Sequence, residues 1–485
     1  MSAVASEERL FDVPVVERAE AGGEPKAPVD KTFRRYDPHQ VFLLPPSIDD
    51  WVPEGHLARF VSELVDEVLD LGPFLAAYTE VRGYPPYDPR LMLKLLIYGY
   101  VTGVRSSRAI ERRCTDDVAF RFLAANQSPD YRSVARFRRR HLKALEGLFL
   151  EALGLCRAAG MVKLGRVALD GTKVRANASR RKAMSYQRMG EREAALQAEV
   201  DALLAEAEAT DAAEDAEFGP DNRGDDLQGE LARRESRLAK IRQAKADLEA
   251  EARERAADKA AERARRSGAD EAQVADAAAR AAEEAVPDPK AQRNFTDPES
   301  RIMKTSDGSF HQCFNGQAVV DEAHQVIVAS DLHNCAADAP SFVPLLDATI
   351  ANCGQIPREF LADAGYFSED NANAATERAV DALIATGRLK HHETPPPAPR
   401  GRIPADATVK ERMARKLRTK KGKASYARRK AIVEPVFGQM QTLQDGDRLL
   451  LRGTEAARAE WNLLNACHNL RKLFGVTGTA KVAMT

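Results

Sequence analysis

No segment of this 485-residue sequence is long and apolar enough to cross a membrane. The longest apolar stretch, residues 91–101, contains Lys94 and reaches about half the length that a membrane-spanning helix needs. The first twenty residues are acidic and lack the apolar centre of a signal peptide. These features argue against membrane and secreted proteins, and they predict a protein of the cytoplasm.

Cysteine pairs and cofactor signatures are also missing. The six cysteines include no Cys-x-x-Cys pair, which argues against a zinc ribbon or a disulfide framework and favours reduced thiols. The sequence has no P-loop and no Gly-x-Gly-x-x-Gly, so chemistry driven by ATP or NAD has no support. Excess charge is absent as well, because 72 basic residues face 73 acidic ones. Any field that attracts a polyanion must therefore be local.

The length suggests about two to four domains. The composition and pattern of the sequence change at five places and predict five segments, one of them in two pieces. These are a flexible N-terminal arm (1–48), a helical domain (49–160), an α/β domain in two pieces (161–180 and 291–450), a helical insertion between the pieces (181–290) and a C-terminal helix (451–485).

Apolar residues at three- and four-residue steps predict helices throughout residues 51–157. One helix should open at Asp88-Pro89, a second should cover residues 106–113, and a third should cover 134–159. The third begins with a face that is basic and free of acids, and this face includes Arg136, Arg139 and Arg140. It indicates a DNA-binding surface, and the alternative is a solvated helix paired with acids elsewhere.

After Gly165 the pattern becomes one of strands alternating with helices. Strands are expected at 166–172, 317–321, 326–330, 359–363 and 380–385, with helices at 341–352 and 368–378. This mixed order predicts an α/β layer. Between the first two strands, residues 181–285 are rich in Ala, Glu and Arg, which is typical of long helices. The break at 218–222 and the spacing of apolar residues close to a heptad seam predict an inserted helical hairpin, whose simplest role is a solvated spacer. The apolar residues of this seam are Leu231, Leu238, Ile241 and Leu248.

Three acidic residues stand in apolar surroundings. Asp170 and Asp363 each end a strand, and Glu434 lies between apolar residues of a later helix. A carboxylate in such a place needs a partner, and three of them together would suit two Mg²⁺ or Mn²⁺ ions that act on phosphodiesters. Taken singly, a strand-terminal Asp is more often a turn cap. His333, Cys335 and Asp338 favour a polar loop that opens the next helix over a zinc site.

The most basic stretch of the chain lies shortly before Glu434. Residues 401–430 contain twelve Lys or Arg residues and two acids. Such a charge is hard to neutralise internally, so the stretch is expected to contact the phosphates of DNA. Lys420, Lys421 and Lys423 are the residues expected to do so.

Three motifs in this order resemble the DDE transposases of bacterial insertion sequences. They are Val-Ala-Leu-Asp-Gly-Thr-Lys at 167–173, Leu-Ala-Asp-Ala-Gly-Tyr-Phe-Ser at 361–368, and Tyr-x-x-Arg followed by Val-Glu-Pro-Val-Phe-Gly at 426–438. Residues 87–138 are similar to the N-terminal helical domain of these enzymes. The resemblance also covers the link at 294–304 and the segment at 314–320.

This resemblance implies an RNase H-like mixed sheet with flanking helices, of α+β or α/β class, preceded by an all-helical DNA-binding domain and interrupted by the helical hairpin. It implies that Asp170, Asp363 and Glu434 hold two Mg²⁺ or Mn²⁺ ions. Tyr426 and Arg429 match the Tyr-x-x-Arg motif, which the family associates with DNA ends and phosphates. One departure is Gln441, which stands where the family often has Lys.

By the same resemblance, the partners are double-stranded DNA at the terminal inverted repeats of the element and at the target. A homodimer on DNA and association with the bacterial nucleoid are expected. Two alternatives stay open. One is a two-metal nuclease that cuts but does not join, and the other is a DNA-binding protein whose catalysis has decayed, for which Gln441 is the hint.

Overall fold

The computed structural model describes residues 47–78, 86–179, 182–217, 226–387, 397 and 400–479. Three features predicted from the sequence lie outside the described residues. They are residues 1–46 of the arm predicted at 1–48, the break predicted at 218–222, and the side chain of Leu231. None of the described helices combines the length and the apolar character needed to span a bilayer.

The N-terminal part of the described chain is helical, as predicted. Its elements are η1 (Ile48–Trp51), α1 (Leu57–Glu63), η2 (Leu64–Val68), α2 (Gly72–Leu75), α3 (Pro89–Thr102), α4 (Ser107–Asp116), α5 (Val118–Leu123), α6 (Tyr131–Arg140) and α7 (Leu142–Ala158). The side chains of Asp88 and Ser106 cap α3 and α4, so the helix starts read from the sequence are confirmed.

The single helix predicted over 134–159 is wrong. The chain forms two helices there, α6 and α7, and the break falls at His141, whose φ of −112° and ψ of 30° leave the helical region. The buried ring of His141 lies 4.4 Å from the ring of Phe137 and 5.4 Å from that of Phe74. These ring interactions offset the backbone hydrogen bonds that the break removes.

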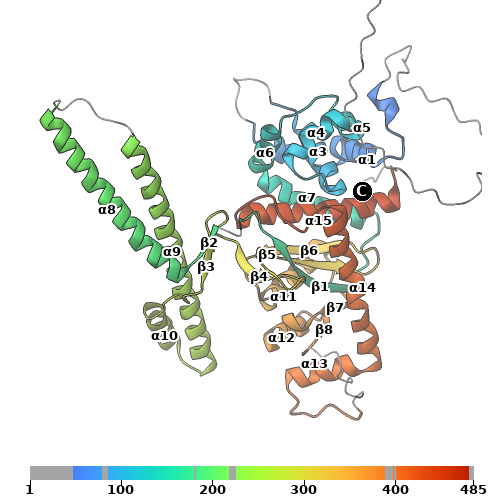
Figure 1. Ribbon diagram of the computed structural model, residues 1–485. Coiled ribbons are helices and arrows are strands. Elements are labelled where there is room, and N and C mark those ends of the chain that lie inside the picture. The colour runs from blue at the N-terminus through green and yellow to red at the C-terminus, as the bar shows by residue number, and fades with distance from the viewer. Residues whose placement is uncertain are drawn as a thin grey trace, which may run out of the picture. The chain divides into compact units, whose positions relative to one another are not determined.

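A mixed sheet forms the centre of the molecule (Figure 1). It contains β1 (Arg166–Arg175), β4 (Arg301–Lys304), β5 (Phe310–Asp321), β6 (Ile327–His333), β7 (Glu359–Ala362) and β8 (Asp381–Ile384). β5 is antiparallel to β1, and β6 and β4 are antiparallel to different parts of β5. On the other side, β7 is parallel to β1 and β8 is parallel to β7. The order β6-β5-β1-β7-β8 is that of an RNase H-like core, so the predicted fold class is confirmed.

Helices cover the sheet and join it to the N-terminal helices. α11 (Phe342–Cys353) and α12 (Glu369–Glu377) connect the strands from β6 to β8. α13 (Val409–Arg418), which the sequence did not indicate as a helix, and α14 (Lys420–Leu443) follow β8, and α14 packs along β1. α15 (Thr454–Thr477) contacts α3 and α7 on one side and β6 on the other, so it lies between the N-terminal helices and the sheet (Figure 1). Its Trp461 is buried, as the sequence predicts for a core residue.

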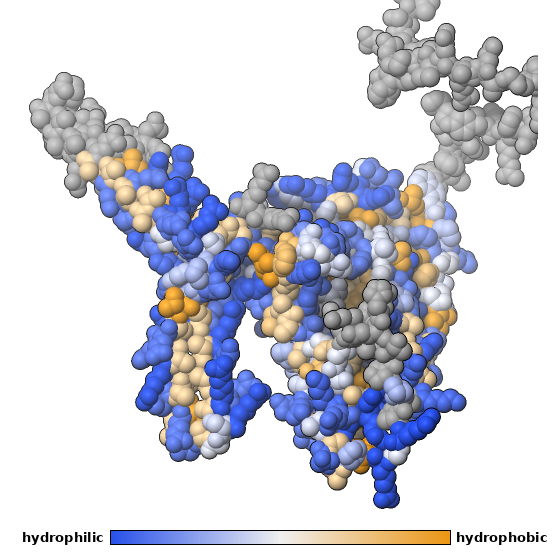
Figure 2. Space-filling view, turned by 60° about the horizontal axis from the view of Figure 1, so that its bottom comes forward, coloured by the Kyte–Doolittle hydropathy of each residue, from blue (hydrophilic) through white to orange (hydrophobic). Residues whose placement is uncertain are grey.

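The insertion between β1 and β5 is built mainly of helices. It contains β2 (Ala183–Ser185), α8 (Tyr186–Glu217), α9 (Asp226–Arg266), α10 (Glu271–Glu283) and β3 (Gln292–Asn294). Leu238, Ile241 and Leu248 pack with Met189 and Leu196 in a small core of their own, which confirms the seam for the residues described. Figure 2 shows a stripe of apolar residues between hydrophilic flanks along the lower arm of the insertion, where α9 and α10 lie.

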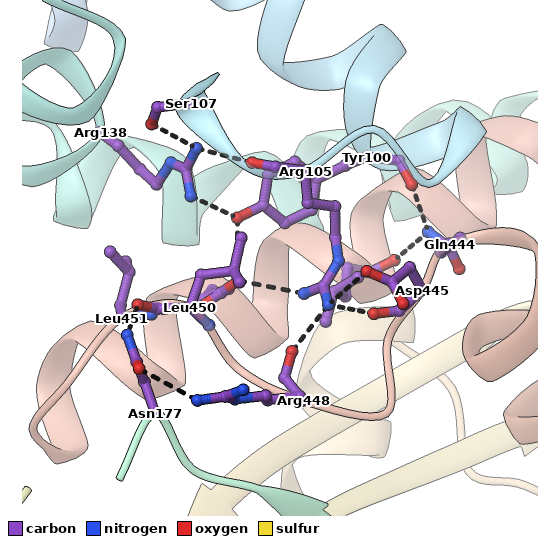
Figure 3. A network of polar contacts seen from close by, with 12 residues as sticks. Tyr100, Arg105, Ser107, Arg138, Asn177, Gln444, Asp445, Arg448, Leu450 and Leu451 are labelled. Carbon is purple, nitrogen blue, oxygen red and sulfur yellow. Dashed lines mark hydrogen bonds and ion pairs between the residues drawn. The ribbon is translucent and has the colours of Figure 1, made fainter. Parts of the chain in front are cut away.

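A buried ion network ties the N-terminal helices to the C-terminal segment (Figure 3). The carboxylate of Glu460 on α15 is fully enclosed and accepts hydrogen bonds from Arg105 Nη1 at 3.2 Å and Tyr100 Oη at 3.0 Å. It also accepts bonds from the backbone N–H groups of Leu450 and Leu451, both at 2.8 Å. Arg138 of α6 donates to Tyr100 Oη and to the Arg105 carbonyl. Every oxygen of the buried carboxylate is therefore satisfied.

Candidate active site

Asp170 and Asp363 lie side by side on two parallel strands. Asp363 directly follows β7, but the prediction that Asp170 ends its strand is wrong, because β1 continues to Arg175 along β5. β1 and β7 are paired with Leu169 opposite Ala362, and the two aspartates are the next residues along these strands. Buried apolar residues precede both, because both faces of the sheet are covered at this point. The parallel register thus brings together two acids that are 193 positions apart in the chain.

Hydrogen bonds to the backbone orient both carboxylates. Asp170 Oδ1 accepts from its neighbour Gly171 N at 3.0 Å, and Asp363 Oδ1 accepts from Gly365 N at 2.8 Å. Asp363 is also the N-cap of η5 (Ala364–Tyr366). A Cβ at position 365 would lie 3.0 Å from Asp363 Oδ1 and 3.1 Å from Asp338 Oδ2. Glycine at 365 therefore lets these oxygens come close to the turn.

Arg429 of α14 supplies the positive charge nearest to Asp170. Its Nη1 donates to Asp170 Oδ2 at 2.8 Å, and its side chain is only 11% exposed. Burial raises the pKa of Asp170, the Arg429 charge and the Gly171 N–H oppose this effect, and the charge of Asp363 adds to it. The net shift is upward, so one guanidinium does not compensate fully for burial and the second carboxylate.

Tyr426 lies one helical turn before Arg429 and next to the same carboxylates. Burial raises its pKa, the charge of Arg429 lowers it, and Asp363 and Asp170 raise it further. Both members of the Tyr-x-x-Arg motif therefore face the aspartate pair. Whether they also contact DNA stays a prediction.

Glu434 does not join the aspartate pair in this structure. Its side chain is 60% exposed and lies 3.8 Å from Lys430 Nζ. The neighbouring Val433 and Val436 are fully buried, and this packing turns Glu434 outward. Within the described part of the chain, no group of three or more His, Cys, Asp or Glu side chains is arranged to hold a metal ion. The place of Glu434 in a triad stays a prediction.

The helix that carries Glu434 contains Pro435 in its interior and continues past it to Leu443. A proline has no backbone N–H, so it leaves the carbonyl four residues earlier, that of Ala431, without its helical partner. The side chain of Gln325 donates to this carbonyl at 3.2 Å. Gln441, further along α14, is exposed.

The residues that are present fit a hard divalent cation. Carboxylate oxygens are the ligands that Mg²⁺ and Mn²⁺ prefer. Asp170 and Asp363 form a like-charged pair in a half-buried place, and Arg429 neutralises only one of the two charges. A bound cation would neutralise the remaining negative charge of the aspartate pair.

The sequence interpretation missed a polar cluster that adjoins the pair. Asn315 and Gln317 of β5 are fully buried, and Gln317 donates to Asn315. Both amides donate to Asp338, which also pairs with Lys173 of β1, and Gln317 accepts from Tyr366. One signal was available, because Asn-Gly-Gln interrupts an otherwise apolar buried strand. Asp338 does precede a helix, η4 (Ala339–Ser341), as expected of a polar loop, but its side chain does not cap that helix.

The side chains expected to contact DNA are at the surface. Arg136, Arg139 and Arg140 are exposed on α6, while Arg138 between them is buried in the network with Tyr100. Arg140 also lies over the ring of Tyr78.

Lys420, Lys421 and Lys423 are exposed in the first turn of α14. The prediction that the charge of the basic stretch at 401–430 is not neutralised within the protein is partly wrong. Lys421 and several other basic residues of this stretch form ion pairs with acidic residues of the fold. These pairs are Lys416 with Asp381, Lys421 with Asp381 and Glu359, Arg428 with Glu322, and Arg429 with Asp170.

Two family models match the chain. Residues 46–140, which cover η1 to α6, match a transposase domain (DUF772). Residues 284–470, from β3 to most of α15, match the transposase DDE domain. No curated protein and no solved structure matches the chain. The two matches occur in the order that the sequence motifs predict, and the second contains Asp363, Arg429 and Glu434.

Proposed function

This chain belongs to the DDE transposases of insertion sequences, and we propose that it binds the ends of its own element, cuts them and joins them to target DNA. The observation that carries the proposal is the parallel register of β1 and β7, which puts Asp170 and Asp363 next to each other on neighbouring strands. Acids that served only as local caps would not have to meet in this way.

Asp170, Asp363 and Glu434 would hold two Mg²⁺ or Mn²⁺ ions. When bound, such ions activate a water or a 3′-hydroxyl and stabilise the leaving oxygen. For Glu434 to take part, its side chain has to leave Lys430 and turn toward the pair, a movement that its exposure permits. Arg429 would release Asp170 Oδ2 at the same time, because an oxygen next to a divalent cation no longer needs the guanidinium.

The joining step of the proposed reaction conserves phosphodiester bonds. In the cutting step, water hydrolyses one phosphodiester at the element end and leaves a 3′-hydroxyl and a 5′-phosphate. The 3′-hydroxyl then attacks a phosphodiester of the target, where one ester bond forms and one breaks with release of a target 3′-hydroxyl. No covalent enzyme–DNA intermediate and no external energy source are needed. Two element ends have to be handled together, so we propose that a homodimer carries out the reaction.

The test is a cleavage and strand-transfer assay with the full chain, duplexes that end in the element's terminal inverted repeats, and Mg²⁺ or Mn²⁺. Asp170→Asn and Asp363→Asn should lose cleavage and keep DNA binding, because each variant loses a ligand charge and keeps its shape. Asp347→Asn, which removes an acid of α11 that pairs with Arg378, is the control and should cut normally. Wild-type cleavage in either site variant would mean that these residues are turn caps.

The same assay separates the two alternatives. Cleaved ends without joined products would identify a nuclease. End binding without cleavage at any metal concentration would identify a decayed enzyme. In that case Gln441→Lys, which restores the family's charge at an exposed position of α14, should be tried next.

The two basic surfaces are expected to have different tasks on DNA. Neutralising Lys420, Lys421 and Lys423 together should weaken binding to any duplex about equally. It should also reduce the slope of the salt dependence by about 0.9 for each phosphate that is no longer neutralised. Substituting Arg136 and Arg139 should instead reduce the preference for element ends over random DNA. Salt titrations with both kinds of duplex measure the difference. Loss of selectivity in the lysine variant alone would reverse the assignment of the two surfaces.

A further inference from the structure

Asp338 carries a negative charge beside the aspartate pair, but it is not one of the expected metal ligands. Its Oδ1 accepts three hydrogen bonds, from Lys173 Nζ at 3.0 Å, Asn315 Nδ2 at 2.7 Å and Gln317 Nε2 at 2.9 Å. Burial alone would raise the pKa of Asp338, but the bonds from Asn315 and Gln317 and the charge of Lys173 outweigh it and lower that pKa. Asp338 is therefore ionised and can only accept hydrogen bonds.

Because the Asp338 carboxylate can only accept hydrogen bonds, it determines how the neighbouring amide of Gln317 is oriented. Gln317 is fully buried and has to turn its amide nitrogen toward Asp338. The same nitrogen donates to Asn315 Oδ1 at 2.9 Å. Only the amide oxygen of Gln317 is left for Tyr366, and the hydroxyl of Tyr366 donates to it. Asp338 thus sets the direction of the Tyr366 O–H bond through one intervening residue.

Tyr366 is close to the carboxylates of the site. It follows Asp363 by three residues, and its ring is fully buried. Burial, and after it the charges of Asp338, Asp170 and Asp363, hold the pKa of Tyr366 well above its usual value, so the phenol stays protonated. A protonated phenol that is turned toward the pair would donate its hydrogen to a carboxylate oxygen. That bond would compete with a metal ion for the oxygen.

We propose that Asp338 is a positioning residue of the metal site. By orienting Gln317 it holds the Tyr366 hydroxyl away from Asp170 and Asp363, and it keeps their oxygens free for a divalent cation. This inference rests on the metal-binding role proposed above for the two aspartates. It requires that the effect of Asp338 on the metal passes through the hydroxyl of Tyr366, and this requirement can be tested.

The test measures Mn²⁺ binding to the metal-free full chain by titration calorimetry. In Asp338→Asn the new amide can donate to the Gln317 oxygen, so Gln317 can turn over and release the Tyr366 hydroxyl to a carboxylate. Mn²⁺ should bind on the order of tenfold more weakly, as is usual when a residue behind the ligands is changed. Tyr366→Phe removes only the hydroxyl and should bind Mn²⁺ as the wild type does. Combined with Asp338→Asn, it should restore the wild-type affinity.

Asp347→Asn is the control for charge, because Asp347 lies on α11 and pairs with Arg378, outside the cluster. It should bind Mn²⁺ normally. Unchanged Mn²⁺ binding in Asp338→Asn would overturn the inference. So would a failure of Tyr366→Phe to restore binding, because the loss would then come from charge or from the unpaired Lys173.

Two further measurements separate the possible failures. If Asp363→Asn binds Mn²⁺ as tightly as the wild type, the metal site itself is wrong, and the proposed function fails rather than the role of Asp338. Thermal unfolding shows whether each variant is folded. If Asp338→Asn does not fold, Gln317→Met takes its place. Gln317→Met removes the acceptor of the Tyr366 hydroxyl and should weaken Mn²⁺ binding. Adding Tyr366→Phe should then restore the Mn²⁺ affinity.

Discussion

Two groups of charges in this molecule follow opposite rules. Around Glu460, the carboxylate is fully enclosed, an arginine stands beside it, and four hydrogen bonds satisfy both of its oxygens. Around Asp170, two carboxylates stand side by side, one arginine serves the pair, and the Asp170 side chain remains 23% exposed. The first group is balanced by the protein itself, and the second is not.

The difference separates charges that hold the fold from charges kept for a ligand. A buried pair of opposite charges, whose carboxylate is fully hydrogen-bonded, locks α15 and the loop after α14 to the N-terminal helices. A pair of like charges costs stability and is kept only where an outside partner can offset the cost. The comparison therefore connects the Glu460 group with stability, and it is consistent with the chemical role proposed for the Asp170 group.

The largest expected effect is on stability, from Glu460→Gln. This change leaves the buried guanidinium of Arg105 to the exposed carboxylate of Asp445, 3.6 Å away, and it should lower the free energy of unfolding by about 3–5 kcal/mol. Asp363→Asn should leave that free energy unchanged or raise it, because it relieves repulsion within a like-charged pair. Denaturant unfolding of both variants in the absence of metal measures the contrast. Equal losses in the two variants would erase the distinction between the groups.

A smaller effect is expected from Arg429→Gln. The guanidinium and a metal ion compete for Asp170 Oδ2, so its removal should tighten Mn²⁺ binding by roughly tenfold and slightly destabilise the metal-free protein. Arg428→Gln is the matched control, because this neighbouring arginine pairs with Glu322. Weaker Mn²⁺ binding in Arg429→Gln would show that the arginine orients Asp170 for the metal instead of competing with it.

The smallest effect is on the pH dependence of stability. The pKa of Asp170 is raised on folding, so the folded state binds its proton more tightly than the unfolded state does. This group therefore stabilises the fold more as the pH falls, and that contribution is lost as the pH rises from 3.8 through the raised pKa. Asp170→Asn should remove this slope from a series of denaturant titrations.

Asp338 should behave in the opposite way, which sharpens the comparison within the site. Its pKa is lowered from 3.8 on folding, so its contribution to stability is present above that pH and is lost as the pH falls through the lowered pKa. Asp338→Asn should therefore cost stability at neutral pH and none at strongly acidic pH. The same slope in both aspartate variants would contradict the two opposite shifts.

Much of the fold could be read from local patterns. Capping residues such as Asp88 and Ser106 and the apolar spacing between them located α3 and α4, and buried apolar runs located β1 and β7. The break at His141 could not be read, because it depends on a ring contact with Phe74, which lies 67 positions earlier in the sequence. α13 was hidden by its charges, because a helix with one buried residue, Met413, has almost no apolar periodicity.

The sequence by itself indicated which residues are candidates for the chemistry, because acids that follow apolar runs and a basic stretch are visible in the order of residues. Only the tertiary structure decided how they meet. The parallel register of β1 and β7 joins Asp170 to Asp363, the buried valines beside Glu434 turn it to solvent, and Asp338 reaches the site through Gln317. The physical reason is the distance along the chain over which each kind of interaction acts. Strand and helix patterns act over a few residues, whereas the hydrogen bonds and charges of the site connect side chains that are far apart in the chain.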